Sequence, residues 1–190
     1  MIMKQASKTR LLVESSAMIA LAVVLDAIKI NSLPYGGSTT LASMLPILLI
    51  GLKNGPKWGF GTAFVYSAIQ LFLSLGKISA WGLSAKVFIV CILFDYLVAY
   101  SVLGFASFFG RSSRLRALIG AAFAMLLRFL SHFITGITIW ATWADGFRAV
   151  MLYSLGYNST FMVPEFILTM VVMVLLTQVT QVRRLIGLAR

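Results

Sequence analysis

The stretch Val87–Phe109, VFIVCILFDYLVAYSVLGFASFF, is 23 residues long and contains one charged side chain, Asp95. An apolar run of this length can cross a membrane as a helix, since about 20 residues suffice. A carboxylate near the centre of a bilayer costs roughly 2.5 to 3.5 kcal/mol on insertion scales. A chain that keeps such an acid usually offers it to an ion, a proton or a ligand, so Asp95 is the first candidate functional residue.

Comparable apolar runs fill the rest of the chain. Hydrophobic residues make up 60% of the 190 residues and charged residues only 11%, which excludes a water-soluble domain. The pattern predicts an all-α membrane protein with six transmembrane helices in a single domain, residues 1–190, and its second span is short. The six runs are Arg10–Ile30, Leu41–Leu52, Trp58–Leu75, Leu83–Phe109, Leu118–Thr142 and Ser159–Gln181.

The net charge of +11 reflects membrane topology. Basic residues fall in short clusters between the apolar runs, and eleven of the 16 lie on the side that also holds both termini. The positive-inside rule places that side in the cytoplasm. The outward loops are then expected at 31–40, 76–82 and 143–158, and no nucleic-acid partner is expected.

Three polar side chains lie at related depths within the predicted spans. Asp95 and His132 are each 14 residues from the inner end of their span, about 21 Å at 1.5 Å per residue. Arg128 lies one turn below His132. An internal ion pair between Asp95 and Arg128 would explain both charges without any ligand. A ligand role for Asp95, with Arg128 serving elsewhere, is the favoured interpretation, because other polar and aromatic groups gather just above that depth.

Aromatic and amide groups gather above this depth, near the expected outer face. Trp140 follows His132 by two turns, and Tyr153, Tyr157 and Asn158 precede the last span, where Asn158 is the expected helix N-cap. Outer-face tryptophans such as Trp81 are equally well explained by the interfacial aromatic belt. A carboxylate with aromatic faces and hydrogen-bonding groups suits a small, planar, cationic or nitrogen-rich heterocycle. One histidine and scattered acids do not make a metal site, and no catalytic triad is present.

Four segments in order resemble the thiamine-specific S components of energy-coupling factor transporters. They are Pro34–Ser38 (PYGGS), Leu93–Ala99 (LFDYLVA), Leu127–His132 (LRFLSH) and Tyr153–Asn158 (YSLGYN). The resemblance implies a multi-pass protein of the bacterial plasma membrane that captures thiamine from outside with high affinity. It also implies delivery through a transmembrane coupling subunit driven by two cytoplasmic ATPases, with no cofactor and no enzymatic activity.

The resemblance also implies roles for individual residues. The family's thiamine-binding positions fall on Asp95, Tyr96, His132, Trp140, Tyr153 and Asn158, with Tyr35, Gly37, Ser38, Trp81, Arg128 and Tyr157 close by. The contact with the coupling subunit falls on Ser16 and Ala20, a pair of small residues at four-residue spacing that lets membrane helices approach closely. Packing of this pair within the chain is the alternative.

The sequence departs from the family pattern at two places. Some members carry Glu at the position of Asp95, and some carry a Trp where this chain has Gly36-Gly37-Ser38. A precursor or analogue of thiamine is therefore a possible ligand. Three other functions stay open: an S component for a related heterocycle such as a B6 vitamer, a self-sufficient carrier in which Asp95 and His132 relay protons, and a structural membrane subunit.

Overall fold

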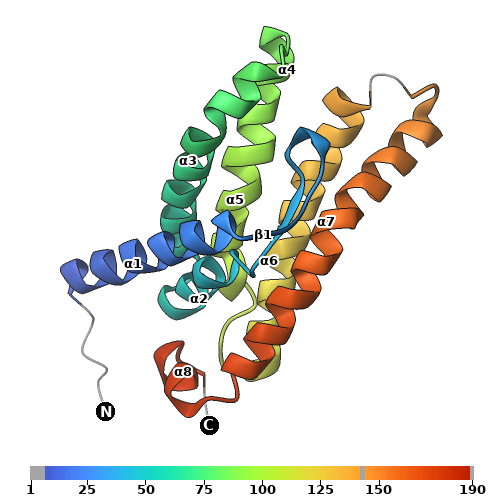
Figure 1. Cartoon of the computed structure of the whole chain (residues 1–190). Helices are drawn as coiled ribbons and strands as arrows, with labels where there is room; N and C mark the ends of the chain where they lie inside the picture. The colour runs from blue at the N-terminus through green and yellow to red at the C-terminus, as the bar shows by residue number, and fades with distance from the viewer. Residues whose placement is uncertain (1–6, 142–143, 189–190) are drawn as a thin grey trace.

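The computed structural model describes residues 7–141 and 144–188, which form a bundle of long helices with one small hairpin (Figure 1). The α-helices are α1 (Lys8–Ala27), α2 (Leu45–Asn54), α3 (Pro56–Ala80), α4 (Ala85–Val90), α5 (Ala99–Ser101), α6 (Arg114–Thr135), α7 (Phe147–Leu176) and α8 (Thr180–Leu185). Two π-helices, η2 (Cys91–Val98) and η4 (Gly136–Trp140), and two 3₁₀ segments, η1 (Pro34–Gly36) and η3 (Val102–Ser107), complete the helical elements. Strands β1 (Lys29–Ser32) and β2 (Ser38–Thr40) pair antiparallel.

Four helices in the described part of the chain are long and apolar enough to cross a membrane. They are Pro56–Ala80, Ala85–Ser107, Arg114–Trp140 and Phe147–Leu176. These helices confirm the last four apolar runs of the sequence and make the chain a multi-pass membrane protein. The first two predicted spans are helical as well, but α1 carries four charged residues and α2 has 10 residues. In Figure 1, α1 runs across the direction of α6 and α7.

Three glycines bring α2, α3 and η3 into backbone contact. A Cβ atom on Gly51 would lie 2.7 Å from the carbonyl oxygen of Gly104, and a Cβ on Gly104 would collide with the backbone of Gly59. Small residues of this kind let membrane helices approach closely, where van der Waals contact supplies much of the attraction. The main hydrophobic core surrounds this crossing, with fully buried Leu48, Leu103 and other apolar side chains.

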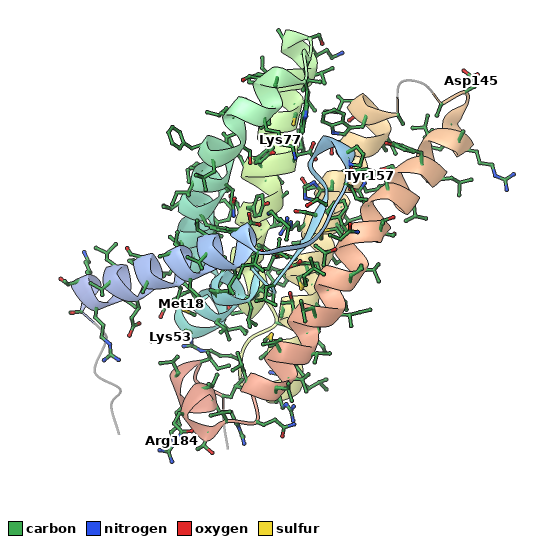
Figure 2. All side chains as sticks on the ribbon, viewed as in Figure 1. Met18, Lys53, Lys77, Asp145, Tyr157 and Arg184 are labelled. Atoms are coloured by element: carbon green, nitrogen blue, oxygen red, sulfur yellow. The ribbon has the colours of Figure 1, made fainter. Side chains whose placement is uncertain are left out.

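The end of the bundle that holds α8 is fastened by arginine side chains. Arg111 donates hydrogen bonds to the carbonyl oxygens of Leu52, at 2.9 Å, and of Lys53. Arg114 donates to the carbonyl oxygen of Val174 at 2.9 Å. Both thereby bind carbonyl groups in the last turns of α2 and α7, where helical backbone donors run out. Figure 2 shows Lys53 and Arg184 toward this end and Asp145 at the opposite end.

Three details of the sequence prediction are wrong at the hairpin end. The predicted loop 31–40 lies mostly in the β-hairpin, so the fold is not purely helical. The predicted loop 76–82 is mostly helix, since α3 continues to Ala80. The predicted loop 143–158 is also mostly helix, because Gly146, with φ of 86°, begins α7 at Phe147. Asn158 therefore lies inside α7 and is not an N-cap.

Candidate ligand-binding cavity

A cavity of about 860 Å³ opens between the hairpin and the long helices. Its size falls within the roughly 300 to 1,000 Å³ typical of small-molecule sites. The wall is assembled from α1, the hairpin, α3, η2, α6, η4 and α7, so segments far apart in the sequence meet here. The main hydrophobic core lies beyond the cavity, toward the α8 end.

Asp95 lies at the centre of a polar network in the wall of the cavity. Its Oδ1 atom lies 3.0 Å from Nδ1 of His132 and accepts a hydrogen bond from the hydroxyl of Thr135. Its Oδ2 atom accepts a hydrogen bond of 2.9 Å from the indole nitrogen of Trp140. The equal depth predicted for Asp95 and His132 is thus confirmed. Three donors on one carboxylate fix its position and offset part of the cost of placing it inside a membrane helix.

Asp95 and Trp140 both lie in π-helical segments. Asp95 is in η2, which interrupts the helix Ala85–Ser107, and Trp140 ends η4, which continues α6. A π-helical turn holds more residues than an α-helical turn and therefore changes the direction of the side chains that follow. Such segments occur mostly as single turns within α-helices and are frequent at functional sites. Here they bring the carboxylate and the indole to within hydrogen-bonding distance of each other.

Arg128 forms part of the floor of the cavity rather than a pair with Asp95. Its guanidinium group lies 4.2 Å from the ring centroid of Tyr100, close enough for a cation–π interaction. Its Nε atom also donates to Nε2 of His132 at 3.5 Å. Asp95 and Arg128 do not form an ion pair with each other in the described part of the chain, residues 7–141 and 144–188. The alternative explanation, an internal ion pair of Asp95 with Arg128, is therefore wrong, because the stacked position on Tyr100 holds the guanidinium below His132.

Aromatic side chains line the upper part of the cavity. The rings of Trp81 and Trp140 meet edge to face, with centroids 5.6 Å apart and planes at 87°. On the opposite wall, the ring of Phe161 packs against the rings of His132 and Tyr157, with ring centroids 5.9 Å apart in both pairs. These faces and edges surround the carboxylate of Asp95 with polarisable surface, which favours a flat ligand that carries positive charge.

One face of α7 supplies the wall that faces the hairpin. Tyr153, Tyr157 and Phe161 follow one another at four-residue spacing and all line the cavity. The backbone nitrogen of Gly37 donates to the hydroxyl of Tyr157 at 3.2 Å, and that hydroxyl donates to the carbonyl oxygen of Pro34. Figure 2 places Tyr157 beside the hairpin. The tip of the hairpin is therefore held against α7 by one tyrosine.

Asn158 connects α7 to α6. Its side-chain nitrogen donates to the carbonyl oxygens of His132, at 3.2 Å, and of Ser154, at 2.9 Å. Ser154 in turn donates to the carbonyl oxygen of Phe133 at 2.8 Å. These contacts fall where α6 passes into η4, so they support the backbone that carries His132 and Trp140.

The cavity brings together nearly all of the side chains selected from the sequence. Those lining it are Tyr96, Asp95, His132, Trp140, Tyr153, Asn158, Gly37, Ser38, Trp81, Arg128 and Tyr157. The side chain of Tyr35 lies outside the described part of the structure. Sequence reasoning missed Thr135, Phe161 and the ion pair of Lys29 with Asp26, at 2.8 Å, whose residues also line the cavity. Thr135 lies one turn beyond His132, so helical spacing alone could have indicated it.

A family model described as "Thiamine transporter protein" matches residues 12–184 of this chain. The match covers nearly all of the helical bundle and every cavity-lining residue. The chain belongs to the thiamine transporter protein family. Members of this family are transporters, so the chain is not an enzyme.

Two relatives of this thiamine transporter family member illustrate the similarity. The chain is 33% identical to the thiamine transporter ThiT of Bacillus subtilis (strain 168) over 188 residues, covering 92% of this chain and 93% of that protein. The solved structure of ThiT from Listeria monocytogenes has the same fold, with a TM-score of 0.70 and 20% identity over 96% of this chain and 99% of that one.

Proposed function

We propose that this protein is the thiamine-binding S component of an energy-coupling factor importer. The observation that carries the proposal is the Asp95 network, a carboxylate with 13% of its side chain exposed, beside the ring of Trp140 in a cavity of about 860 Å³. Thiamine joins a permanently cationic thiazolium ring to an aminopyrimidine. The carboxylate would balance the cation, and the aromatic walls would contact both rings.

The same geometry supports a set of proposed binding residues. Asp95, Tyr96, His132, Trp140, Tyr153 and Asn158 are proposed as the ligand contacts. His132 and Asn158 are already held by the helices around them, so little ordering entropy is lost when the ligand binds. The departures at Asp95 and Gly36-Gly37-Ser38 make a thiamine precursor or analogue the second candidate ligand.

The proposed topology has six spans, with both termini in the cytoplasm and the cavity facing outward. It is supported by the basic residues at the α8 end, which include Lys53, Arg111, Arg114, Arg183 and Arg184. Labelling with an impermeant maleimide in whole cells tests this orientation, because the native Cys91 is buried. A cysteine at Asp145 should react from outside and one at Ser112 should not. The reverse result would overturn the orientation.

The proposed contact with the coupling subunit uses α1. Ser16 and Ala20 are exposed on that helix, whereas their neighbours Ser15 and Ile19 are buried. This exposure argues against the alternative, packing of the pair within the chain. A small exposed pair at four-residue spacing allows another membrane helix to approach closely.

Purified protein provides the test of binding. Thiamine should quench tryptophan fluorescence in a saturable way with one-to-one stoichiometry, because Trp140 lies beside the proposed ligand. Competition with a pyrimidine precursor and with a B6 vitamer distinguishes the related ligands. Absence of saturable quenching at micromolar thiamine would overturn the assignment.

Reconstitution provides the test of coupling. Uptake into proteoliposomes should require the coupling subunit and both ATPases. Ala20→Trp should abolish uptake and leave thiamine binding unchanged, because only the partner helix meets that position. Phe72→Trp is the matched control, since Phe72 is 75% exposed on α3. Uptake by this chain alone, driven by a pH gradient, would instead establish a self-sufficient carrier.

A further inference from the structure

Glu165 is a second acid within a helix long enough to span the membrane, and unlike Asp95 it is buried. It lies in α7, and only 2% of its surface is exposed. The cavity wall does not include it among the described residues. A carboxylate placed there carries the same insertion cost as Asp95, so its retention calls for a function that the proposed ligand contacts do not supply.

The partner of Glu165 is the inner end of the hairpin. The backbone nitrogen of Thr40 donates to Oε2, and the hydroxyl of Thr40 lies 2.9 Å from Oε1 and 3.0 Å from Oε2. The same hydroxyl hydrogen-bonds that of Ser43 at 2.7 Å. The neighbouring Thr39 donates to the carbonyl oxygen of Phe161 at 3.1 Å. These hydrogen bonds are buried, whereas those of Tyr157 at the tip are part-buried or exposed, so this is the firmer attachment of the hairpin.

The hairpin is thus attached to α7 at two levels. Tyr157 holds its tip and Glu165 holds the end of β2, two helical turns further along the same face of α7. Between these two points lie Gly37 and Ser38, which form part of the cavity wall, and Phe161, which contacts His132. The position of β2 therefore determines how closely the wall approaches a ligand.

We propose that Glu165 is a positioning residue for the binding site, one that fixes β2 against α7 and thereby sets the rate at which bound thiamine leaves. This inference rests on the proposed function for its ligand. The amide of Thr40 donates to Oε2 of Glu165 and the hydroxyl of Thr40 donates to Oε1, so both carboxylate oxygens accept. A glutamine would offer one acceptor oxygen and place an amide donor against a second donor.

The experiment measures thiamine dissociation from the full-length protein in detergent or nanodiscs, for Glu165→Gln, Thr40→Val and the double variant. Glu165→Gln should accelerate dissociation about tenfold, and Thr40→Val, which keeps its backbone donor, should do so by a smaller factor. The double variant should resemble Glu165→Gln, because both changes remove one interaction. Glu14→Gln is the matched control, since Glu14 pairs with Lys53 and Arg10 away from the cavity. Its dissociation rate should equal that of the natural protein.

Hydrogen exchange at residues 38–40 gives a second readout that needs no ligand. The amide of Thr40 should exchange faster in Glu165→Gln than in Glu14→Gln at equal overall stability. Unchanged dissociation in folded Glu165→Gln, or additive effects in the double variant, would overturn the proposal. Should Glu165→Gln fail to fold, an unchanged rate in Thr40→Val would overturn it. If the natural protein binds no thiamine, the proposed function fails, and exchange at Thr40 still decides whether Glu165 fixes the hairpin.

Discussion

The indole of Trp140 donates a hydrogen bond of 2.9 Å to the carboxylate of Asp95. One residue therefore supplies the negative charge of the cavity and also orients an aromatic ring beside it. A ligand that approaches the carboxylate meets a ring whose plane is already set, since that ring also packs edge to face with Trp81. Pre-organisation of this kind reduces the entropy lost on binding.

Trp140→Phe removes the hydrogen-bond donor of the indole and keeps an aromatic ring. The phenyl ring keeps part of the stacking surface but cannot donate to Asp95, so we expect thiamine affinity to fall about tenfold. Most of the fluorescence quenching should disappear as well, which a titration measures directly. Trp58→Phe is the control, because Trp58 donates to Ser15 at 2.9 Å, away from the cavity. Equal loss of quenching in both variants would contradict a ligand beside Trp140.

Asp95→Asn tests the counter-charge. The variant should lower the affinity for thiamine by about tenfold to a hundredfold, which is the loss expected for one hydrogen bond or contact with a charged group. The affinity for a thiophene analogue without the positive charge should fall much less. Competition binding measures the affinities for both compounds. If thiamine and the analogue lose affinity equally, the role of Asp95 is to hold His132, Thr135 and Trp140 in place.

Gly37→Ala tests the closeness of the hairpin to α7. An added Cβ would lie 2.8 Å from Cδ1 of Phe161 and 3.0 Å from the hydroxyl of Tyr157. We expect the hairpin to be displaced, with thiamine affinity reduced about tenfold and stability lowered by about 1 to 3 kcal/mol. Gly61→Ala is the control, because a Cβ there meets nothing within 4 Å and Gly61 lies in α3. That variant should keep its affinity and be slightly more stable.

Arg111→Gln tests the fastening at the α8 end. The shorter side chain cannot reach both carbonyl oxygens at the end of α2, so the midpoint of thermal unfolding should fall by an amount corresponding to about 1 to 3 kcal/mol. Thiamine affinity should not change, because Arg111 lies far from the cavity wall. Arg116→Gln is the matched control, since Arg116 makes an exposed hydrogen bond to Ser112 at 2.9 Å. A similar loss in both variants would show that Arg111 contributes only surface charge.

The long helices could be predicted from the sequence because burial in lipid demands continuous apolar runs, and these are visible locally. The hairpin could not. Its strands have four and three residues, β1 is exposed throughout, and its contacts lie far away, such as that of Gly37 with Tyr157, 120 residues apart. The start of α7 was predicted as a loop because Arg148, Tyr153 and Asn158 interrupt the apolar pattern, although none of them breaks a helix.

The residues of the cavity could be predicted more reliably from their depth in the membrane than from the local sequence pattern. Asp95 and His132 were placed at the same level by counting residues, and the structure joins them at 3.0 Å. The same rule applies to Glu165, the one acid between Phe147 and Leu176. The position of Arg128 could not be predicted, because stacking on Tyr100 depends on how α6 and α5 meet.

The two π-helical segments make the cavity sensitive to the insertion or deletion of single residues. Deleting one residue from Cys91–Val98, or from Gly136–Trp140, would hardly alter composition or hydrophobicity. It would turn the side chains beyond the deletion by roughly 100° about the helix axis. The carboxylate and the indole would then face different neighbours, although every chemical group was still present. Alignments that place a gap inside either segment would therefore equate side chains that point in different directions.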